Sequence, residues 1–182
     1  MPELQLLRPD HARALLKFER ENRAYFAAWV PDRGDDYFAS FDARHRALLA
    51  EQSAGMCYFH VLVDGDGEVV GRVNLVDLAD GSAELGYRIA ERAAGRGLAT
   101  SAVRRVCGLA STDYGLTSLR AATAPDNLAS QAVLTRAGFV LAGSVELDGQ
   151  PEVRFVRDLT VDGTGRPADR CEGDAWQSSS TR

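Results

Sequence analysis

The stretch Arg92-Ala-Ala-Gly95-Arg96-Gly97-Leu98-Ala99-Thr100 constrains the fold most, because it joins a strand-like segment, residues 83–89, to the start of a helix. Its two glycines can adopt backbone angles that are closed to other residues. The first N–H groups of the following helix have no internal partner and point into the same space. A turn of this kind predicts an anion site, and a pyrophosphate fits such a site with little help from side chains.

The glycine spacing distinguishes this loop from two common nucleotide-binding loops. A mononucleotide loop has the form G-x-x-x-x-G-K-[ST], and neither Lys-Ser nor Lys-Thr occurs in the chain, so hydrolysis of ATP or GTP is not expected. A dinucleotide loop has a third glycine, in G-x-G-x-x-G, that is missing here. The remaining pattern is R-x-x-G-x-G, in which Arg92 and Arg96 add positive charge to the helix end. Taken alone, it also fits an ordinary helix-capping turn.

The R-x-x-G-x-G pattern resembles the acetyl-CoA pyrophosphate loop of the GNAT superfamily of N-acetyltransferases. This resemblance implies that acetyl-CoA is the co-substrate and that no metal takes part. It also implies that the cofactor is bound by a set of residues in and beside the loop, namely Ile89, Arg92, Gly95, Arg96, Gly97, Leu98, Ala99 and Thr100.

A second segment follows about thirty residues later, in the order that the GNAT family has. Residues 127–139 read as a helix that is capped by Asp126 or Asn127 and closed by Gly138. The segment resembles the N-x-x-[AS]-x-x-x-x-x-x-x-G-F pattern that lines the pantetheine arm in GNAT proteins. Asn127 and Ser130 are therefore expected to bind the cofactor. The competing interpretation is a plain amphipathic helix, for which the apolar residues of the segment would suffice.

Length and composition favour a single cytoplasmic domain. The chain has 182 residues, of which 45% are hydrophobic, enough to bury one good core. No run approaches eighteen apolar residues, and the N-terminus lacks a basic region followed by an apolar one, so we expect neither a membrane partner nor secretion. The cysteines, Cys57, Cys107 and Cys171, have no metal-like spacing and are expected to be reduced thiols.

The charge of the chain bears on its partners. The net charge is −5, and the acidic residues are dispersed rather than gathered into a tail. Binding of phosphates needs a basic face, so nucleic acid is not expected as a direct partner. An acidic protein suits a cationic acceptor, although many cytosolic enzymes with neutral substrates are equally acidic.

Hydrophobic periodicity predicts an α/β (α+β) fold in the order β-α-α-β-β-β-α-β-α-β-β. This order resembles the GNAT arrangement, which implies a central, mixed, mostly antiparallel twisted sheet of about seven strands flanked by about four helices. We expect one GNAT domain over residues 1–159 and a disordered tail over residues 160–182. The strands are expected at residues 4–8, 57–63, 69–78, 83–89, 119–124, 140–147 and 153–159, and the helices near residues 9–22, 37–55, 97–114 and 127–138.

Transfer of an acetyl group from a thioester to an amine requires a neutral amine. An α-amino group with a pKa of about 7.7–8 is partly neutral at pH 7, whereas a lysine with a pKa of about 10.4 is almost wholly protonated. A positioned carboxylate can take the proton that the amine loses, which contributes about 10²–10⁴ in rate. Glu84 is the candidate base, because alternation places its charge inside a central strand, on the face of Gly86. The competing interpretation is an ion pair with Arg72 or Arg88.

The leaving thiolate, with a pKa of about 8.5, benefits from a proton donor or a hydrogen bond. Many GNAT enzymes have a tyrosine seven positions after the motif asparagine, and here that position is Leu134. Acid catalysis by a tyrosine at the usual site is therefore excluded. Ser130 carries the nearest hydroxyl on the correct helical turn, and we expect it to hydrogen-bond the sulfur or the pantetheine. Alternatively, Ser130 is a small residue that only lets the cofactor pass.

Serine at position 130 with leucine at position 134 resembles the RimJ/RimL branch, which acetylates the N-termini of ribosomal proteins. Residues 22–31 resemble the N-R-x-[FHY]-[FL]-x-x-W-x-P segment of that branch, and Gly86-Tyr87 resembles its G-Y pair before the loop. The aromatic residues would form a wall beside the acceptor or, alternatively, a hydrophobic cap on the first two helices. The resemblance implies substrate binding by Asn22, Arg23, Tyr25 and Trp29.

Three functions remain open. The first is acetylation of a protein N-terminus, such as that of a ribosomal protein, and the second is acetylation of a small amine such as an aminoglycoside, a polyamine or an amino acid. The third is a CoA-binding module without turnover, which the intact loop, Asn127 and Glu84 disfavour. The protein would act as a monomer or a homodimer.

Overall fold

A mixed sheet of seven strands forms the centre of the protein. The structure is a computed structural model, and it describes residues 1–147 and 149–160. The strand order is β1-β2-β3-β4-β5-β7-β6, and neighbours pair antiparallel except β4 and β5, which pair in parallel. The predicted mixed, mostly antiparallel sheet is therefore confirmed. The strands span Glu3–Leu6 (β1), Tyr58–Val63 (β2), Val69–Ala79 (β3), Ser82–Ile89 (β4), Ser118–Thr123 (β5), Val140–Leu147 (β6) and Gln150–Asp158 (β7).

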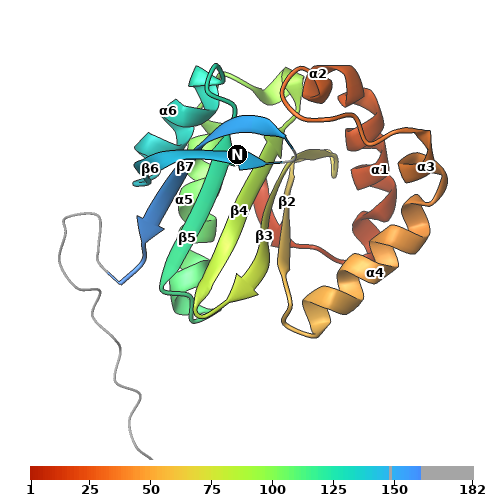
Figure 1. Cartoon of the computed structure of the whole chain (residues 1–182). Helices are drawn as coiled ribbons and strands as arrows, with labels where there is room; N and C mark the ends of the chain where they lie inside the picture. The colour runs from red at the N-terminus through yellow and green to blue at the C-terminus, as the bar shows by residue number, and fades with distance from the viewer. Residues whose placement is uncertain (148, 161–182) are drawn as a thin grey trace, which may run out of the picture.

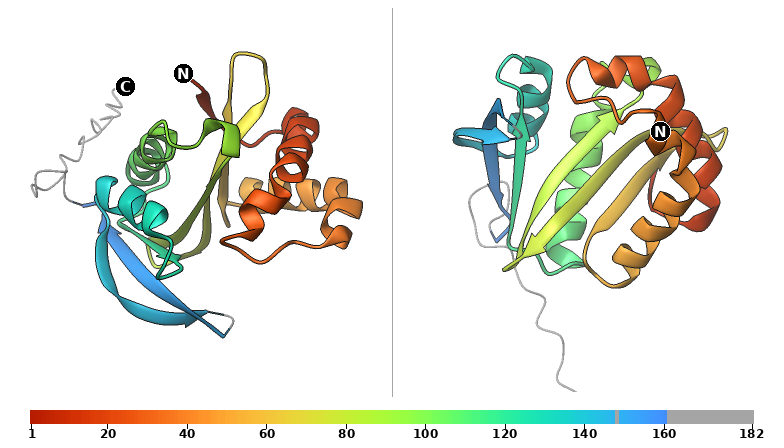
Figure 2. Two further views of the ribbon diagram at one scale, coloured as in Figure 1. Left: turned by 90° about the horizontal axis from the view of Figure 1, so that it is seen from above. Right: turned by 45° about the vertical axis from the view of Figure 1, so that its right-hand side comes forward.

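Helices cover both faces of the sheet. Four of them, α1 to α4, lie on one face, and α5 and α6 lie on the other (Figures 1 and 2). The α-helices of the described residues span Ala12–Glu21 (α1), Arg23–Ala27 (α2), Asp35–Ala39 (α3), Phe41–Ser53 (α4), Leu98–Thr112 (α5) and Leu128–Arg136 (α6).

The structure thus has six α-helices in its described part, where the sequence predicted about four. The helices α2 and α3 have five residues each, which is too short for an apolar stripe to recur, so periodicity could not reveal them. The stripe expected over residues 37–55 is divided at Ser40, whose φ of −100° and ψ of 14° interrupt the helix. The expected tail lies outside the described residues except for Thr160, and so does Cys171.

Two hydrophobic cores form because the strands alternate their side chains between the two faces. On β2, Phe59 and Val61 pack against α1 to α4, whereas Leu62 faces the core under α5 and α6. On α5, Leu98 and Leu109 are only half-buried. The buried face of α5 is made by Ala102, Val103, Val106, Cys107 and Ala110.

The parallel contact between β4 and β5 is short, and this creates room for a site. The two strands pair only where Ser82–Glu84 meets Ser118–Arg120, and beyond that point they diverge (Figure 1). The next residues of both strands, 85–89 and 121–124, line a single pocket. The fold therefore opens the middle of its own sheet at the carboxyl end of β4, where the glycine loop begins.

Other features of the described part bear on the remaining predictions. No helix there is long and apolar enough to cross a membrane, and no group of three or more His, Cys, Asp or Glu side chains could hold a metal ion. Cys57 and Cys107 are buried free thiols, and burial raises the pKa of each to about 11. A thiol with so high a pKa is almost wholly protonated at neutral pH, and such thiols react slowly.

Candidate active site

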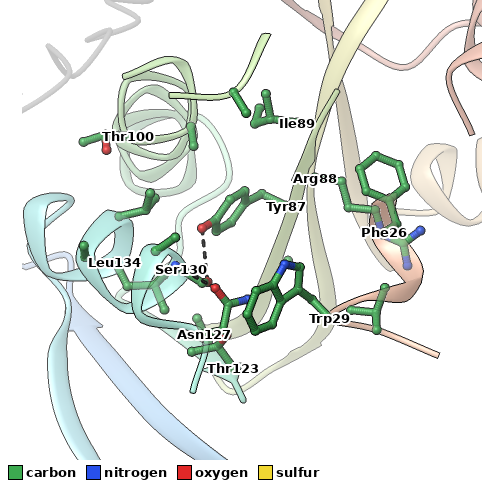
Figure 3. Close-up of a pocket in the computed structure, with 18 of the residues that line it drawn as sticks. Phe26, Trp29, Tyr87, Arg88, Ile89, Thr100, Thr123, Asn127, Ser130 and Leu134 are labelled. Atoms are coloured by element: carbon green, nitrogen blue, oxygen red, sulfur yellow. Dashed lines mark hydrogen bonds between the residues drawn. The ribbon is translucent and has the colours of Figure 1, made fainter. Parts of the chain in front are cut away.

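The pocket between the diverging strands has a volume of about 790 Å³, within the range of small-molecule sites. Its walls come from α2 and the segment after it, β3, β4, the glycine loop, α5, β5, α6 and one residue of β7. Figure 3 shows the pocket with Trp29 near the centre of the view and the hydroxyls of Tyr87 and Ser130 pointing toward one another. Segments far apart in sequence therefore contribute to one cavity.

The glycine loop has the geometry that the sequence predicted for an anion cradle. Gly95 and Gly97 both have φ of +74°, a left-handed conformation that disfavours side chains, and Gly97 is the N-cap residue of α5. No side chain caps this helix end, so its first N–H groups remain available to a ligand. A Cβ atom built on either glycine would meet no atom within 4 Å, which means that the space in front of the loop is open.

Most of the predicted cofactor-binding residues meet in this pocket. Two of them do not line it: Arg96 is exposed beside it, and the guanidinium of Arg92 pairs with the carboxylate of Asp64 at 3.3 Å on the turn after β2. Arg92 is thus engaged with a carboxylate rather than turned into the cradle. The pocket lining contains Ile89, Gly95, Gly97, Leu98, Ala99, Thr100, Asn127 and Ser130.

The start of α6 is fixed by Asn127, as one of the two predicted caps. Its side-chain oxygen accepts a hydrogen bond from the backbone N–H of Ser130 at 3.0 Å. This bond closes the first turn of α6 and sets the position of the Ser130 side chain in the pocket. The amphipathic alternative is met in part, because Leu134 is buried and Val133 packs against the core, whereas Leu128 is 71% exposed.

Tyr87 is a functional candidate that sequence reasoning did not assign. Its hydroxyl donates a hydrogen bond to the Oγ of Ser130 at 3.1 Å, and burial raises the pKa of Tyr87 although this hydrogen bond opposes the rise. Leu134, at the position of the usual tyrosine, lines the pocket with a buried side chain. The signal for Tyr87 was in the G-Y pair, which the resemblance identified without giving the tyrosine a role.

Glu84 does not line the pocket. Its carboxylate lies 3.5 Å from the guanidinium of Arg120 on β5, directly opposite in the parallel register. The expected alternative partners, Arg72 and Arg88, instead bind Glu19. The prediction of an ion pair therefore named the wrong partners, and the role of Glu84 as the base stays a prediction.

The four predicted substrate-binding residues separate into two pairs. Tyr25 and Trp29 line the pocket, and the Trp29 side chain is 47% exposed. Asn22 is buried, where its amide donates to the carbonyl of Phe18 and accepts from the N–H of Glu91, each at 2.9 Å. Both ends of this amide are used, so Asn22 anchors the helices and does not line the acceptor wall.

Arg23 also lies outside the main pocket. Its guanidinium binds Asp32 at 2.6 Å and Asp35 at 2.7 Å, and these two carboxylates raise the pKa of Arg23. The charge of Arg23 is therefore committed to the chain that follows α2.

Two arginines to which the sequence analysis gave no binding role line the pocket. Arg72 and Arg88 face each other directly across β3 and β4, an arrangement of like charges that is destabilising unless a carboxylate is shared. The carboxylate of Glu19 on α1 provides it, at 2.6 Å from Arg72 and 3.2 Å from Arg88. Arginines inside two adjacent strands were the available signal, but only the register shows that they are opposite each other.

Comparisons with known proteins agree with this geometry. The family model described as "Acetyltransferase (GNAT) domain" matches residues 3–140. The "Probable N-acetyltransferase YjcK" of Bacillus subtilis (strain 168) is 29% identical over 130 residues, which cover 68% of this chain and 72% of that protein.

Two solved structures are also similar. Ribosomal-protein-S5-alanine acetyltransferase from Vibrio fischeri has a TM-score of 0.81 and 20% identity, covering 90% of this chain and 94% of that one. Mycobacterium smegmatis RimJ, solved in complex with CoA-disulfide, has a TM-score of 0.76 and 25% identity, covering 85% and 80%. Together with the family match over most of the chain, they show that this chain belongs to the GNAT family of acetyltransferases and is RimJ/RimL-like.

Proposed function

We propose that the chain transfers an acetyl group from acetyl-CoA to the N-terminal α-amine of a protein, such as a ribosomal protein. One observation carries the proposal: a single pocket joins two kinds of wall. One wall is an uncapped helix end with two left-handed glycines, and the other is formed by the aromatic residues Tyr25 and Trp29. We retain the cytoplasmic location and a monomeric or dimeric state as predictions.

The residues present fit acetyl-CoA. The open space in front of Gly95 and Gly97 would take its pyrophosphate, held by the first N–H groups of α5. Ala99 and Thr100 on α5 and Ser130 on α6 would line the pantetheine arm. When bound, acetyl-CoA supplies an acetyl thioester that an amine can attack. Mycobacterium smegmatis RimJ, which was solved with CoA-disulfide, supports this choice of co-substrate.

Ser130 would stabilise the leaving sulfur. Because Tyr87 already donates to the Oγ of Ser130, the hydrogen of the Ser130 hydroxyl is left for another acceptor. A thiolate developing beside α6 would be that acceptor. Tyr87 then positions Ser130 and polarises its hydroxyl, a task that its raised pKa suits because Tyr87 stays protonated.

The acceptor amine would reach the pocket past Trp29. An α-amine needs less help from a base than a lysine, because a larger fraction of it is neutral at pH 7. The Vibrio fischeri neighbour is named for the alanine of ribosomal protein S5, and that name supports a protein N-terminus as the acceptor.

The decisive experiment uses a peptide that carries both a free N-terminus and internal lysines, incubated with enzyme and acetyl-CoA and read by mass spectrometry. We expect acetylation of the α-amine of a peptide that begins with Ala or Ser. Trp29→Ala should raise KM for the peptide far more than KM for acetyl-CoA, and Trp29→Phe should have a smaller effect. Modification of the lysines alone, or rapid acetylation of a small amine without modification of the peptide, would overturn the proposed acceptor.

A further inference from the structure

Three arginines surround one carboxylate at the acceptor end of the pocket. Arg33, Arg72 and Arg88, which we call the arginine cluster, all line the pocket. The carboxylate of Glu19, which is 2% exposed, lies 2.6 Å from Arg72, 3.2 Å from Arg88 and 3.6 Å from Arg33. Glu19 itself does not line the pocket, so the arginines stand between this carboxylate and the cavity.

The cluster carries more positive charge than its carboxylate can offset. Three guanidinium charges against one carboxylate leave a surplus of two positive charges. Asp32, the acidic residue next to Arg33 in sequence, pairs with Arg23 at 2.6 Å. Burial, together with the charges of Arg33 and Arg72, lowers the pKa of Arg88, while the carboxylate of Glu19 opposes this shift.

Aromatic rings support two of these arginines beside the acceptor wall. The guanidinium of Arg88 lies over the ring of Phe26 at 5.2 Å, and that of Arg33 lies over the ring of Tyr37 at 4.5 Å. The Arg33 side chain is 31% exposed, so it can reach a ligand. In Figure 3, Arg88 lies on one side of Trp29 and the Tyr87–Ser130 hydrogen bond on the other. In this view Trp29 therefore lies between Arg88 and the hydroxyl pair.

The lining of the whole pocket also carries a net positive charge. Besides the cluster, its charged lining residues are Arg136 on α6 and Glu152 on β7, and Glu152 has an interaction of its own. A protonated acceptor amine would be repelled here, whereas a neutral amine, which is the nucleophile, would be favoured. An acceptor that brings its own carboxylate would be attracted, because guanidinium groups bind carboxylates with charge-assisted, often paired hydrogen bonds.

We propose that the arginine cluster binds a carboxylate of the acceptor, so that the preferred acceptor is a peptide with Asp or Glu within the first few residues after its α-amine. This inference rests on the proposed function and names its substrate class. It runs against the cationic acceptor that the net charge of −5 suggested.

The test compares two peptides that begin Ser-Glu-Glu and Ser-Gln-Gln and are otherwise identical and uncharged. We expect kcat/KM for the acidic peptide to exceed that for the neutral one by roughly tenfold or more, since hydrogen bonds to charged groups are the strong ones. Both peptides are also titrated by calorimetry into enzyme loaded with CoA, which measures binding without turnover. The acidic peptide should bind more tightly by a similar factor, and its advantage should shrink as salt is added.

Variants of Arg33 locate the effect. Arg33→Gln should reduce the preference for the acidic peptide, and Arg33→Glu, which leaves two arginines against two carboxylates, should bring the two peptides close to equal. Arg33 is chosen because its contact with Glu19 is the longest of the three, whereas loss of Arg72 would leave Glu19 buried without its shortest partner. The matched control is Arg44→Gln, since Arg44 also lies over the ring of Tyr37, at 5.6 Å, but does not line the pocket.

The outcomes separate the two proposals. Equal turnover and equal binding of both peptides would overturn the carboxylate site and leave the proposed function standing. Tighter binding of the acidic peptide without acetylation would support the carboxylate site and overturn the peptide acceptor. Acetylation of free glutamate in preference to glutamine, with neither peptide bound, would overturn both the proposed function and the peptide class named here.

Discussion

At the scale of single residues, the hydrogen bond between Tyr87 and Ser130 makes a specific prediction. Ser130→Ala should lower kcat by about 10²–10³, because it removes a donor from the place where charge develops. Tyr87→Phe should lower kcat by roughly tenfold, since Tyr87 acts only through Ser130. In steady-state kinetics, kcat and kcat/KM should fall together while KM for acetyl-CoA changes little.

Ser101→Ala is the matched control, because Ser101 follows the loop on α5 but does not line the pocket. If kcat is unchanged in Ser130→Ala, Ser130 only lets the cofactor pass and the assignment fails.

Glu84 is tested by comparison with its partner. A general base contributes about 10²–10⁴, so Glu84→Gln should lower kcat/KM most at low pH and recover partly as pH rises through the α-amine pKa. Arg120→Gln breaks the same ion pair but removes no base. If pH profiles of the two variants show the same small loss at every pH, the ion pair is structural and Glu84 is not the base.

The sequence could predict the place of a site residue where the backbone conformation required a particular residue type. It could not do so where the place depended on which strand residues pair. Gly95 and Gly97 could be assigned because a turn into a helix needs left-handed residues. Alternation places Glu84 and Arg88 on the same face of β4. It cannot tell which residues of the neighbouring strands lie beside them. The register puts Arg120 opposite Glu84, and a helix 53 positions before Arg72 in sequence supplies Glu19.

At the scale of elements, the N-terminus of α5 is the feature that a single substitution can test. Gly97→Glu should weaken acetyl-CoA binding severely, because a side chain and a negative charge would occupy the place of the phosphate. The expected calorimetric result is loss of measurable binding, with a thermal transition that remains cooperative.

Gly34→Glu is a close control for the backbone strain in this test. Gly34 is also the N-cap residue of a helix, has φ of +75° and has open space around it, but it lies outside the pocket. Gly34→Glu should cost at least as much stability as Gly97→Glu, because the ψ of 167° at Gly34 lies in a region that is essentially restricted to glycine, whereas Gly97 has ψ of 2°. Only Gly97→Glu should affect the cofactor. Normal acetyl-CoA affinity in a folded Gly97→Glu protein would show that the loop does not hold the pyrophosphate.

Element order could be predicted because most helices and strands here are long enough to show a period. The helices α5 and α6 carry their own start signals, a glycine turn and an asparagine cap. The five-residue helix α2 has neither a period nor a side-chain cap, and it forms where Phe26 can pack against Phe18, with ring centroids 5.3 Å apart. Tertiary packing of this kind has no local signature, which is why the aromatic segment appeared only as a connection.

At the scale of the whole molecule, the net charge of the chain does not predict the charge of its pocket. The chain has five more acidic than basic residues, yet four arginines and one glutamate line the pocket. Carboxylates elsewhere on the protein are partly screened by solvent, whereas arginines in the pocket act at short range in a lower dielectric. The sign of the pocket therefore depended on the fold and could not be predicted from composition.

His60 connects the sheet to the segment after α5, and its titration should be visible in the stability of the whole protein. Its Nδ1 lies 3.2 Å from the carbonyl of Val73, and its Nε2 lies 2.8 Å from the hydroxyl of Tyr114. Since a carbonyl can only accept, Nδ1 carries the proton, and Nε2 accepts from Tyr114. The ring of Tyr58 stacks on the ring of Tyr114, with centroids 3.6 Å apart, and so supports the residue that binds Nε2 of His60. Both nitrogens are thus satisfied by the neutral ring.

Burial lowers the pKa of His60 to about 4 in the folded protein, from the ordinary histidine value of 6.5. The unfolded chain therefore binds more protons between these two values, so stability is full above about pH 6.5 and falls as pH drops toward 4. From pH 7 to pH 5 the contribution of His60 to the free energy of unfolding should fall by roughly 2 kcal/mol. Urea unfolding of the wild type and of His60→Gln at the two pH values measures it.

The non-titrating His60→Gln protein should show less pH dependence than the wild type by that amount. Tyr114→Phe is the control, because it removes the hydrogen bond to Nε2 but keeps the histidine, so it should lower stability at both pH values and retain the dependence. If His60→Gln and the wild type lose equal stability between pH 7 and pH 5, His60 does not stay neutral in the folded protein. The buried ring would then have to be protonated against the hydrogen-bond pattern that joins β2, β3 and Tyr114.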